Sequence, residues 1–114
     1  PHAVGNPFFS WLPFRPVKGE LLRLAIHDFP RDYIINRHLF VIPLADGTFR
    51  AGATYDWRNL NWQGSEVGQA ELLEKTTKLL KRPVEVLGHW AGIRPATADR
   101  RPLVGMHPAH PNIG

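Results

Sequence analysis

The chain has 114 residues, 43% of them hydrophobic and 21% charged, which is typical of one globular domain and excludes a disordered chain. It contains no cysteine, so disulfides, thiolate metal sites and a cysteine nucleophile are excluded together. The basic residues behind the net charge of +4 are scattered, and we interpret them as a solvated face in preference to a nucleic-acid surface.

The first part of the chain predicts two extended segments. Residues 1–16 carry four prolines among aromatic side chains, which excludes a regular helix, so we expect this opening to be extended and partly buried. Residues 17–26 form a run with strand propensity, in which Gly19 allows the backbone to bend or to approach another group closely. A strand over residues 17–26 therefore begins the predicted sheet.

A hairpin is predicted where Asp46 and Gly47 separate two apolar runs. This dipeptide favours a two-residue turn, because both central positions of such a turn need positive φ. Side chains alternate along a strand, so the paired residues would share one face, and two alanines in its middle would leave room for another group. The predicted pairs are Leu44 with Phe49, Ile42 with Ala51, Phe40 with Ala53, and His38 with Tyr55.

One helix and one further strand follow the hairpin. Ser65 is a favourable N-cap, and the helix is predicted to run from there to about Arg82, where Pro83 ends it. Residues 84–93 predict another strand, and residues 102–105 a last short extended piece. We therefore expect an α+β fold, a mostly antiparallel β-sheet with one main helix packed on one face. The stripe of the helix that would face the sheet consists of Leu72, Leu73, Thr76, Leu79 and Leu80.

Motifs that carry chemistry on their own are absent from the sequence. It has no Gly-x-Gly-x-x-Gly after a strand, no Walker A lysine loop and no Gly-x-Ser-x-Gly elbow, so no catalytic residue is assigned. His107 and His110 have a helical spacing, but Pro108 and Pro111 exclude a regular helix, and a loop pair is preferred to a metal site. No apolar run is long enough to span a bilayer and no signal peptide is recognisable, so we expect a cytoplasmic protein.

Arg94 is the strongest candidate for a binding residue. Pro95 directly after it biases its backbone away from the helical region, and Gly92 two places before it leaves space for a close approach. A planar guanidinium held in this way can pair with a carboxylate through two hydrogen bonds. From the local sequence alone, a ligand carboxylate and an ordinary salt bridge are equally favoured.

Three motifs, in order along the chain, resemble those of a known family. The stretch GHWAGIRPATADRRPLVG resembles the Gly-x-Arg-Pro-x-Thr-x-Asp-x-x-Pro-x-x-Gly signature of flavin-dependent amine and amino-acid oxidoreductases, the D-amino-acid oxidase-like group with glycine and sarcosine oxidases. PVKGELL resembles their Pro-x-Lys-Gly motif, and FVIPLADGTFRAGATYD resembles their strand-turn-strand motif. The resemblance covers about residues 16–114, and the aromatic opening is its least diagnostic part.

The resemblance implies that residues 1–114 are a single domain, the substrate-binding part of a larger oxidoreductase whose FAD-binding Rossmann part is absent. It implies FAD as the cofactor of that parent protein and a small amino or imino acid as its substrate. The implied reaction is hydride transfer to the flavin from the carbon that bears the amine. We expect this chain to be inactive alone and not to bind FAD tightly.

The resemblance also assigns site residues. Arg94 matches the family arginine that pairs with the substrate carboxylate, and Phe40 and Tyr55 match positions that line the substrate pocket. Several relatives have a tyrosine where this chain has Phe40, so one hydroxyl contact is missing here, and Tyr55 is a candidate to supply it. Pro95 and Gly19, which belong to two of the three motifs, are assigned to contacts with the flavin.

Two other functions stay open on the sequence. A stand-alone carboxylate- or peptide-binding module descended from this domain would have no redox activity, and a Gly-x-Gly-x-x-Gly upstream in the parent reading frame would exclude it. A nucleic-acid-binding domain would need an affinity that falls steeply with salt. We prefer the substrate-binding domain, whose partner is the FAD-binding domain of the same parent chain, with no nucleic acid and no membrane span.

Overall fold

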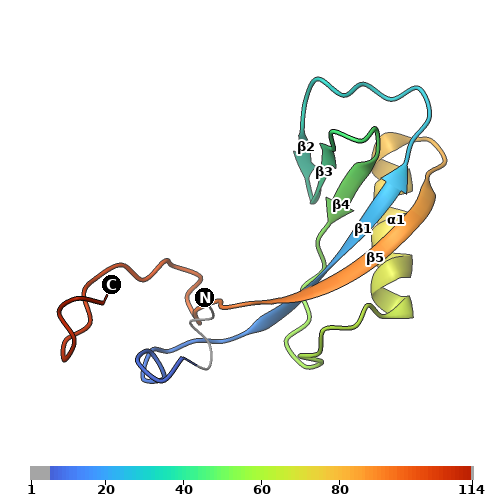
Figure 1. Cartoon of the computed structure of the whole chain (residues 1–114). Helices are drawn as coiled ribbons and strands as arrows, with labels where there is room; N and C mark the ends of the chain where they lie inside the picture. Colours follow the sequence, from blue (N-terminus) through green and yellow to red (C-terminus); the bar gives the residue numbers. More distant parts are fainter. Residues whose placement is uncertain (1–5, 114) are drawn as a thin grey trace.

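The computed structural model describes residues 6–113 and consists of an antiparallel sheet with one helix against it (Figure 1). Its five strands lie in the order β2-β3-β4-β1-β5, so the long strand β1 pairs with β4 on one side and with β5 on the other. This arrangement confirms the predicted α+β fold. The elements are β1 (Val17–Ala25), β2 (Ile35–Arg37), β3 (Leu39–Pro43), β4 (Phe49–Gly52), α1 (Glu66–Leu80) and β5 (Glu85–Arg94).

The hydrophobic core lies between the sheet and α1. Leu22 and Leu24 of β1 pair with Ala51 and Phe49 of β4, and because side chains alternate along a strand, all four point to the same face. Leu72 of α1 is completely buried against them, so the predicted helix stripe is confirmed. Burial of each of the larger side chains stabilises the fold by about 1.5–3 kcal/mol. The buried cluster consists of Leu22, Leu24, Ile26, Leu39, Val41, Phe49, Ala51 and Leu72.

Helix α1 begins where the sequence predicts and ends slightly earlier. Ser65 is the N-cap, and its hydroxyl accepts a hydrogen bond from the backbone N–H of Gly68 at 3.0 Å. The last helical residue is Leu80 rather than Arg82, because Lys81 adopts a left-handed conformation with φ 53° and caps the helix. The polar end of the helix at Ser65 becomes part of the site described below.

The predicted register of the hairpin between β3 and β4 is wrong by one residue. The turn has three residues rather than two, because the N–H of Leu44 donates to the carbonyl of Thr48 at 2.8 Å. Gly47 has φ +91°, the left-handed conformation that closes such a turn. The shift moves Phe49 and Ala51 to the face opposite the one that the sequence predicts for them. The observed pairs are Phe40 with Gly52, Val41 with Ala51, Ile42 with Arg50, and Pro43 with Phe49.

The two ends of the described chain form an extended arm that leaves the sheet (Figure 1). The arm consists of residues 6–16 and 95–113, and the whole molecule measures 55 × 30 × 23 Å. Its opening is not simply extended as predicted, since residues 7–12 form turns. The predicted extended piece at residues 102–105 pairs with no strand in the described part of the chain.

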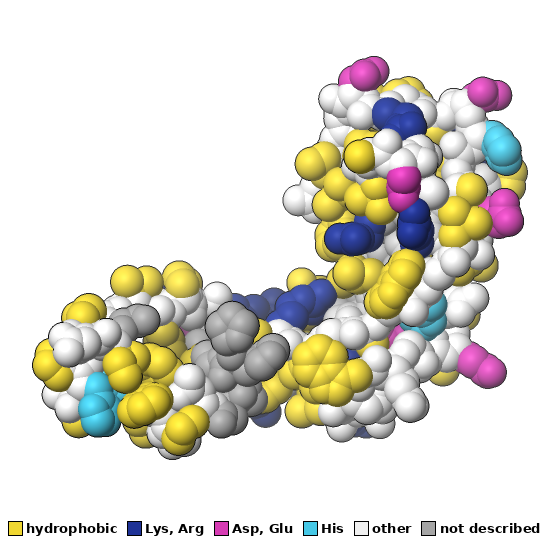
Figure 2. All heavy atoms as spheres, in the orientation of Figure 1, with side chains coloured by type: hydrophobic (Ala, Val, Ile, Leu, Met, Phe, Trp, Pro, Cys, Tyr) yellow, Lys and Arg dark blue, Asp and Glu magenta, His cyan; other side chains and the backbone are white. Residues whose placement is uncertain are grey.

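Hydrophobic side chains are exposed along this arm (Figure 2). Trp11 is 59% exposed and Val104 is 95% exposed. Large apolar side chains gathered in one region are typical of a surface that another part of a protein covers. Of the residues described, none belongs to a helix with the length and apolar character needed to cross a bilayer.

Candidate functional site

The sheet has two faces with different surroundings. Helix α1 lies on one, which we call the covered face, and no helix of the described chain lies on the other, which we call the open face (Figure 1). Lys18 and Glu20 of β1 belong to the covered face, whereas Val17 and Gly19 belong to the open face, because side chains alternate. Val17 pairs with Arg94 of β5, so Arg94 also lies on the open face.

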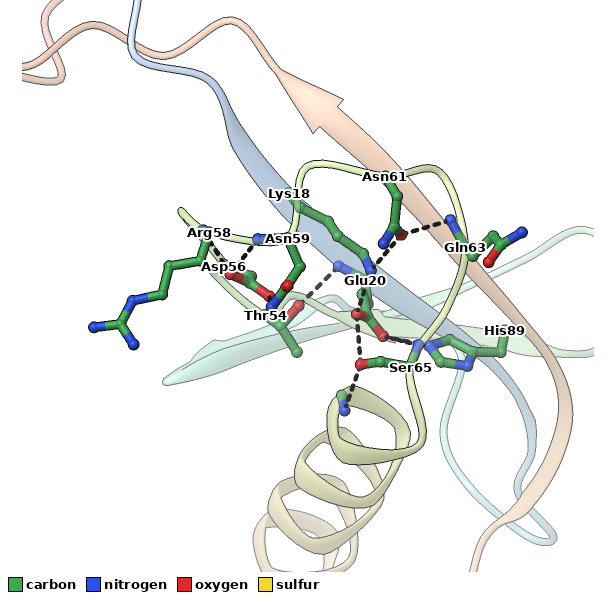
Figure 3. Close-up of polar contacts among 11 residues, drawn as sticks. Lys18, Glu20, Thr54, Asp56, Arg58, Asn59, Asn61, Gln63, Ser65 and His89 are labelled. Atoms are coloured by element: carbon green, nitrogen blue, oxygen red, sulfur yellow. Dashed lines mark hydrogen bonds and ion pairs between the residues drawn. The ribbon is translucent and has the colours of Figure 1, made fainter.

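On the covered face, the carboxylate of Glu20 is held from several sides (Figure 3). Ser65 donates to it twice, through its backbone N–H at 3.0 Å and its hydroxyl at 2.8 Å. The ammonium group of Lys18 lies 3.2 Å from it, and Nε2 of His89 lies 2.7 Å from it. Lys18 also donates to Asn61 Oδ1 at 2.9 Å. Lys18 and Glu20 are each only 2% exposed, so this network is a buried ion pair whose polar atoms are satisfied.

These contacts keep Glu20 ionised. Burial alone raises the pKa of the Glu20 carboxyl, but hydrogen bonds from Ser65, Lys18 and His89 together lower the pKa below its usual value of 4.5. The carboxylate also lies at the N-terminus of α1, where the helix dipole favours negative charge. Gly68 in the first helical turn provides the space, since a Cβ there would lie within 3.0 Å of the Glu20 carboxylate. The network therefore fixes the start of α1 on β1.

The covered-face network is connected to the open face through the segment that follows β4. The backbone N–H of Glu20 donates to the hydroxyl of Thr54 at 2.9 Å. Lys18 and Asp56 exchange two backbone hydrogen bonds, at 2.8 and 2.9 Å. Tyr55 lies between these two anchors in the chain, so the backbone that carries its side chain is attached to β1 on both sides.

Asp56 stabilises the loop that continues from this segment. The backbone N–H of Arg58 donates to its carboxylate at 2.8 Å, and Asn59 donates through its side chain at 2.9 Å and its N–H at 3.1 Å. These hydrogen bonds lower the pKa of Asp56 to about 2. Asp56 is thus a turn residue that holds the loop in place, and its negative charge persists into acid.

Arg94 ends β5 and extends its guanidinium over the open face. One guanidinium N–H donates to the carbonyl of Thr54 at 3.4 Å, which is a long hydrogen bond. The guanidinium carbon lies 4.8 Å from the centre of the Tyr55 ring, a distance at which cation–π attraction acts. No carboxylate among residues 6–113 forms an ion pair with Arg94. The ordinary salt bridge that the sequence left open is therefore not formed within those residues.

The structure brings three of the predicted site residues together. Tyr55 is 67% exposed and contacts Arg94, and Gly19 lies directly under the same guanidinium. Phe40 also lies on the open face, but its strand β3 is separated from β5 by β4 and β1. The open face thus has a compact group around Arg94 and a more distant aromatic side chain at Phe40.

An open groove of about 1250 Å³ is lined by Arg94, by Tyr55 and by both halves of the arm. Most of the other side chains that line the groove are aromatic or aliphatic. The guanidinium of Arg94 therefore has largely apolar surroundings. A guanidinium in such surroundings binds an anion more strongly than it would in water. The apolar residues of the lining include Trp11, Phe14, Trp57, Pro95, Leu103 and Met106.

The histidines considered as metal ligands have structural contacts. Nε2 of His107 lies 2.7 Å from the carbonyl of Phe8, and its Nδ1 accepts from the N–H of Ala109 at 3.0 Å, so this ring joins the two halves of the arm. Nowhere in residues 6–113 do three His, Asp or Glu side chains gather as a metal site would require. His38 is not in a strand as predicted, because it forms the connection between β2 and β3 with φ +62°.

The fold and the sequence define the class of protein. The family described as FAD dependent oxidoreductase matches residues 2–113, and the chain belongs to that family. It is 32% identical over 107 residues to glycine oxidase from Bacillus subtilis (strain 168), a match covering 88% of this chain and 28% of that protein. It is 26% identical over 103 residues to the bifunctional protein ThiO/ThiG from Nostoc sp. (strain PCC 7120 / SAG 25.82 / UTEX 2576), covering 82% and 16%. The resemblance in the sequence motifs is thereby confirmed.

Solved structures share the fold. Glycine oxidase from Geobacillus kaustophilus superposes with a TM-score of 0.74 at 24% identity, covering 90% of this chain and 29% of that chain. Iminodiacetate oxidase from Chelativorans sp. BNC1 also has a TM-score of 0.74, at 20% identity, covering 90% and 30%. Identities this low establish the fold alone. By these coverages, the chain spans less than a third of the length of either protein.

The buried polar network was not predicted from the sequence. A signal for it exists in β1, where Lys18 and Glu20 are two residues apart in an otherwise apolar strand. Side chains with this spacing share one face, and charges on a covered face must pair because unpaired burial is costly. Their partners Ser65 and His89 lie far away in the sequence, so their contribution depends on the three-dimensional fold.

Proposed function

We propose that this chain is the substrate-binding domain of an FAD-dependent oxidoreductase that oxidises the C–N bond of a small amino or imino acid. The observation that carries the proposal is the guanidinium of Arg94, which lies on the open face with no ion-pair partner among residues 6–113. Glycine and iminodiacetate, the compounds in the names of two relatives, both carry carboxylates. A free guanidinium in apolar surroundings suits such a group.

The residues on the open face act by positioning the substrate. Arg94 binds the carboxylate through two parallel hydrogen bonds, and contacts with the Tyr55 ring and the Thr54 carbonyl limit the movement of its side chain. Phe40 provides an apolar wall at a greater distance on the same face. Fixing the carboxylate fixes the amine-bearing carbon relative to the reaction partner, and orientation of this kind is a large part of catalysis.

The surroundings of Arg94 fit a flat, mostly apolar cofactor ring. The groove beside Arg94 is lined largely by aromatic and aliphatic side chains, and we assign Pro95 in its lining to contact with the flavin. When bound, FAD accepts the hydride that leaves the amine-bearing carbon. The exposed apolar side chains of the arm support a second domain of the same parent chain as the partner that covers them. Alone, this chain is expected to be inactive.

Replacement of Arg94 in the flavin-loaded full-length oxidoreductase tests the proposal. Loss of a charge-assisted pair costs about 2–5 kcal/mol, so Arg94→Ala is expected to lower kcat/KM for glycine by roughly 30- to 4000-fold. Arg94→Lys keeps the charge without the planar fork and should give an intermediate loss. Steady-state kinetics measure both, and the visible flavin spectrum should stay unchanged. Unaltered kinetics across a panel of amino acids would contradict the assignment of Arg94.

A second function is also supported by the free guanidinium, namely a carboxylate- or peptide-binding module without redox activity. Visible absorption of the full-length protein separates the two. A yellow protein that is bleached when glycine or another amino acid is added without oxygen supports the oxidoreductase. A colourless protein that FAD does not reconstitute supports the binding module.

A further inference from the structure

Gly19 makes room for the guanidinium of Arg94. A Cβ built on Gly19 would lie within 3.0 Å of three atoms of that guanidinium, including Nη1 at 2.6 Å. Cβ atoms do not approach other heavy atoms so closely, so any side chain at this position would force the guanidinium to move. The backbone does not itself require glycine here, because the glycine with positive φ in the described chain is Gly47.

The glycine opposite Gly19 in the sheet provides a contrast. Gly92 of β5 is the direct cross-strand partner of Gly19, and it lies on the same open face. A Cβ built on Gly92 would meet no atom of the described chain within 4 Å. The two glycines are paired across β1 and β5 and lie on the same face of the sheet. They differ because the guanidinium of Arg94 occupies the space over Gly19 and not the space over Gly92.

We propose that Gly19 is a positioning residue for Arg94 and so sets the affinity for the substrate carboxylate. The inference rests on the proposed function, and it differs from the sequence-based assignment of Gly19 to the flavin. With no side chain at Gly19, the guanidinium lies against the β1 backbone, where the Tyr55 ring at 4.8 Å and the Thr54 carbonyl at 3.4 Å also contact it. A methyl group at Gly19 would occupy the space in which the guanidinium lies. Arg94 would then lose the fixed orientation that lets it form two parallel hydrogen bonds with a carboxylate.

The expected effect of a methyl group is local. The atoms that a Cβ at Gly19 would meet are the far end of a flexible side chain, not backbone. Arg94 can therefore turn away without disturbing the pairing of β1 with β5. We expect Gly19→Ala to leave the thermal unfolding temperature unchanged or slightly raised, because alanine loses less backbone freedom than glycine on folding.

A double-mutant cycle in the flavin-loaded full-length oxidoreductase tests this role, with glycine as substrate. Gly19→Ala should lower kcat/KM by roughly 10- to 100-fold, mainly through a higher KM, since small misplacements of a binding group have effects of this size. In the Arg94→Ala background, where the space over Gly19 is empty, Gly19→Ala should change kcat/KM less than about twofold. Methylamine lacks a carboxylate, so its oxidation should not respond to Gly19→Ala. The flavin spectrum should not shift.

The matched control is Gly92→Ala, whose effect should be the same with and without Arg94. An equal loss for Gly19→Ala in both backgrounds, or a shift of the flavin spectrum, would overturn the inference and favour a role of Gly19 toward the flavin. A crystal structure of the Gly19→Ala variant gives a second measurement, in which an undisplaced guanidinium would also overturn it. If Arg94→Ala itself leaves glycine oxidation unchanged, the proposed function fails first, and that result is visible before Gly19 is considered.

Discussion

The covered and open faces of the sheet each place a charged side chain against a glycine, but they satisfy the charge differently. On the covered face, Glu20 fills the space beside Gly68 and accepts two hydrogen bonds from Ser65 within a buried network. On the open face, Arg94 fills the space over Gly19 and has one long hydrogen bond to a backbone carbonyl. In both places a glycine without a side chain makes room for the charged group. The carboxylate of Glu20 has its partners in place, whereas the guanidinium of Arg94 has no ion-pair partner among residues 6–113.

Under the proposed function, this difference separates the residues that stabilise the fold from those that bind the substrate. A buried charge with all its partners in place fixes the elements that supply those partners, here β1, β5 and the start of α1. A charge without an anion partner contributes little to folding and stays available for a ligand. The two faces are connected through Thr54, whose hydroxyl accepts from Glu20 and whose carbonyl accepts from Arg94. The covered face therefore supports the geometry of the open face.

Glu20→Gln is expected to have the largest effect on stability. Glutamine keeps the size of the side chain but removes the negative charge, so the ammonium of Lys18 is left buried without its anion. Breaking a buried ion pair in this way costs about 3–5 kcal/mol. Arg94→Gln, the matched change on the open face, should cost less than about 1 kcal/mol because Arg94 forms no ion pair within residues 6–113. Chemical denaturation measures the free energy of unfolding of both variants. Equal losses of stability would contradict the proposed difference between the two faces.

The pH dependence of stability isolates the charge of Glu20. Because its pKa in the folded protein lies below 4.5, its ionised form contributes stability above about that pH, and the contribution is lost as the pH falls through the lowered folded pKa. The stability difference between the unchanged protein and Glu20→Gln should therefore shrink on going from neutral pH into acid. A difference that does not change with pH would mean that glutamine destabilises through its shape.

Gly68→Ala is expected to lower the stability by an intermediate amount, although a change from glycine to alanine inside a helix usually raises it. In an open helical position, alanine stabilises by about 1 kcal/mol relative to glycine. Here the new methyl group meets the Glu20 carboxylate, which its partners hold in place, and overpacking of this kind costs about 1–3 kcal/mol. Thermal unfolding of Gly68→Ala and Gly19→Ala compares the two faces directly. A stabilised Gly68→Ala variant would show that the Glu20 carboxylate moves away from a new methyl group as easily as the Arg94 guanidinium does.

The sequence predicts the elements that surround the core because their signals are local. Ser65 as N-cap, the apolar stripe of α1 and the runs that became β1 and β5 all follow from residue type and spacing. The hairpin register was predicted wrongly because Asp46-Gly47 fits both a two-residue turn and a three-residue turn that ends in a left-handed glycine. Strand β2 was not predicted, since Ile35–Arg37 is too short to show a period.

The site was predicted only as far as single residues allow. The motif around Arg94 and Pro95 gave the candidate guanidinium, and the alternation in β1 held a signal for Lys18 and Glu20 that was not used. The contact of Arg94 with Gly19 is different in kind, because it exists only once β1 and β5 pair in one particular register. Contacts between distant strands depend on that register, which no local pattern specifies.

Phe40→Tyr is expected to have the smallest effect on stability, and it tests how the open face accepts a new polar group. Phe40 is half-buried there, so a hydroxyl should change the free energy of unfolding by less than about 0.5 kcal/mol. On the covered face, Phe49 is 1% exposed, and Phe49→Tyr should cost about 1–3 kcal/mol because the hydroxyl is buried in the core. Chemical denaturation measures this pair of changes.

The same Phe40→Tyr variant also links the open face to substrate choice. In the full-length oxidoreductase, the added hydroxyl offers a hydrogen bond that phenylalanine cannot make, so the ratio of kcat/KM values for glycine and for larger amino acids should change. Phe49→Tyr should leave this ratio unchanged even where it lowers stability, because its ring lies on the other side of the sheet. If Phe40→Tyr instead lowers the stability by more than this and leaves the ratio intact in the folded variant, the Phe40 ring serves packing alone, and the proposed binding surface is confined to the group around Arg94.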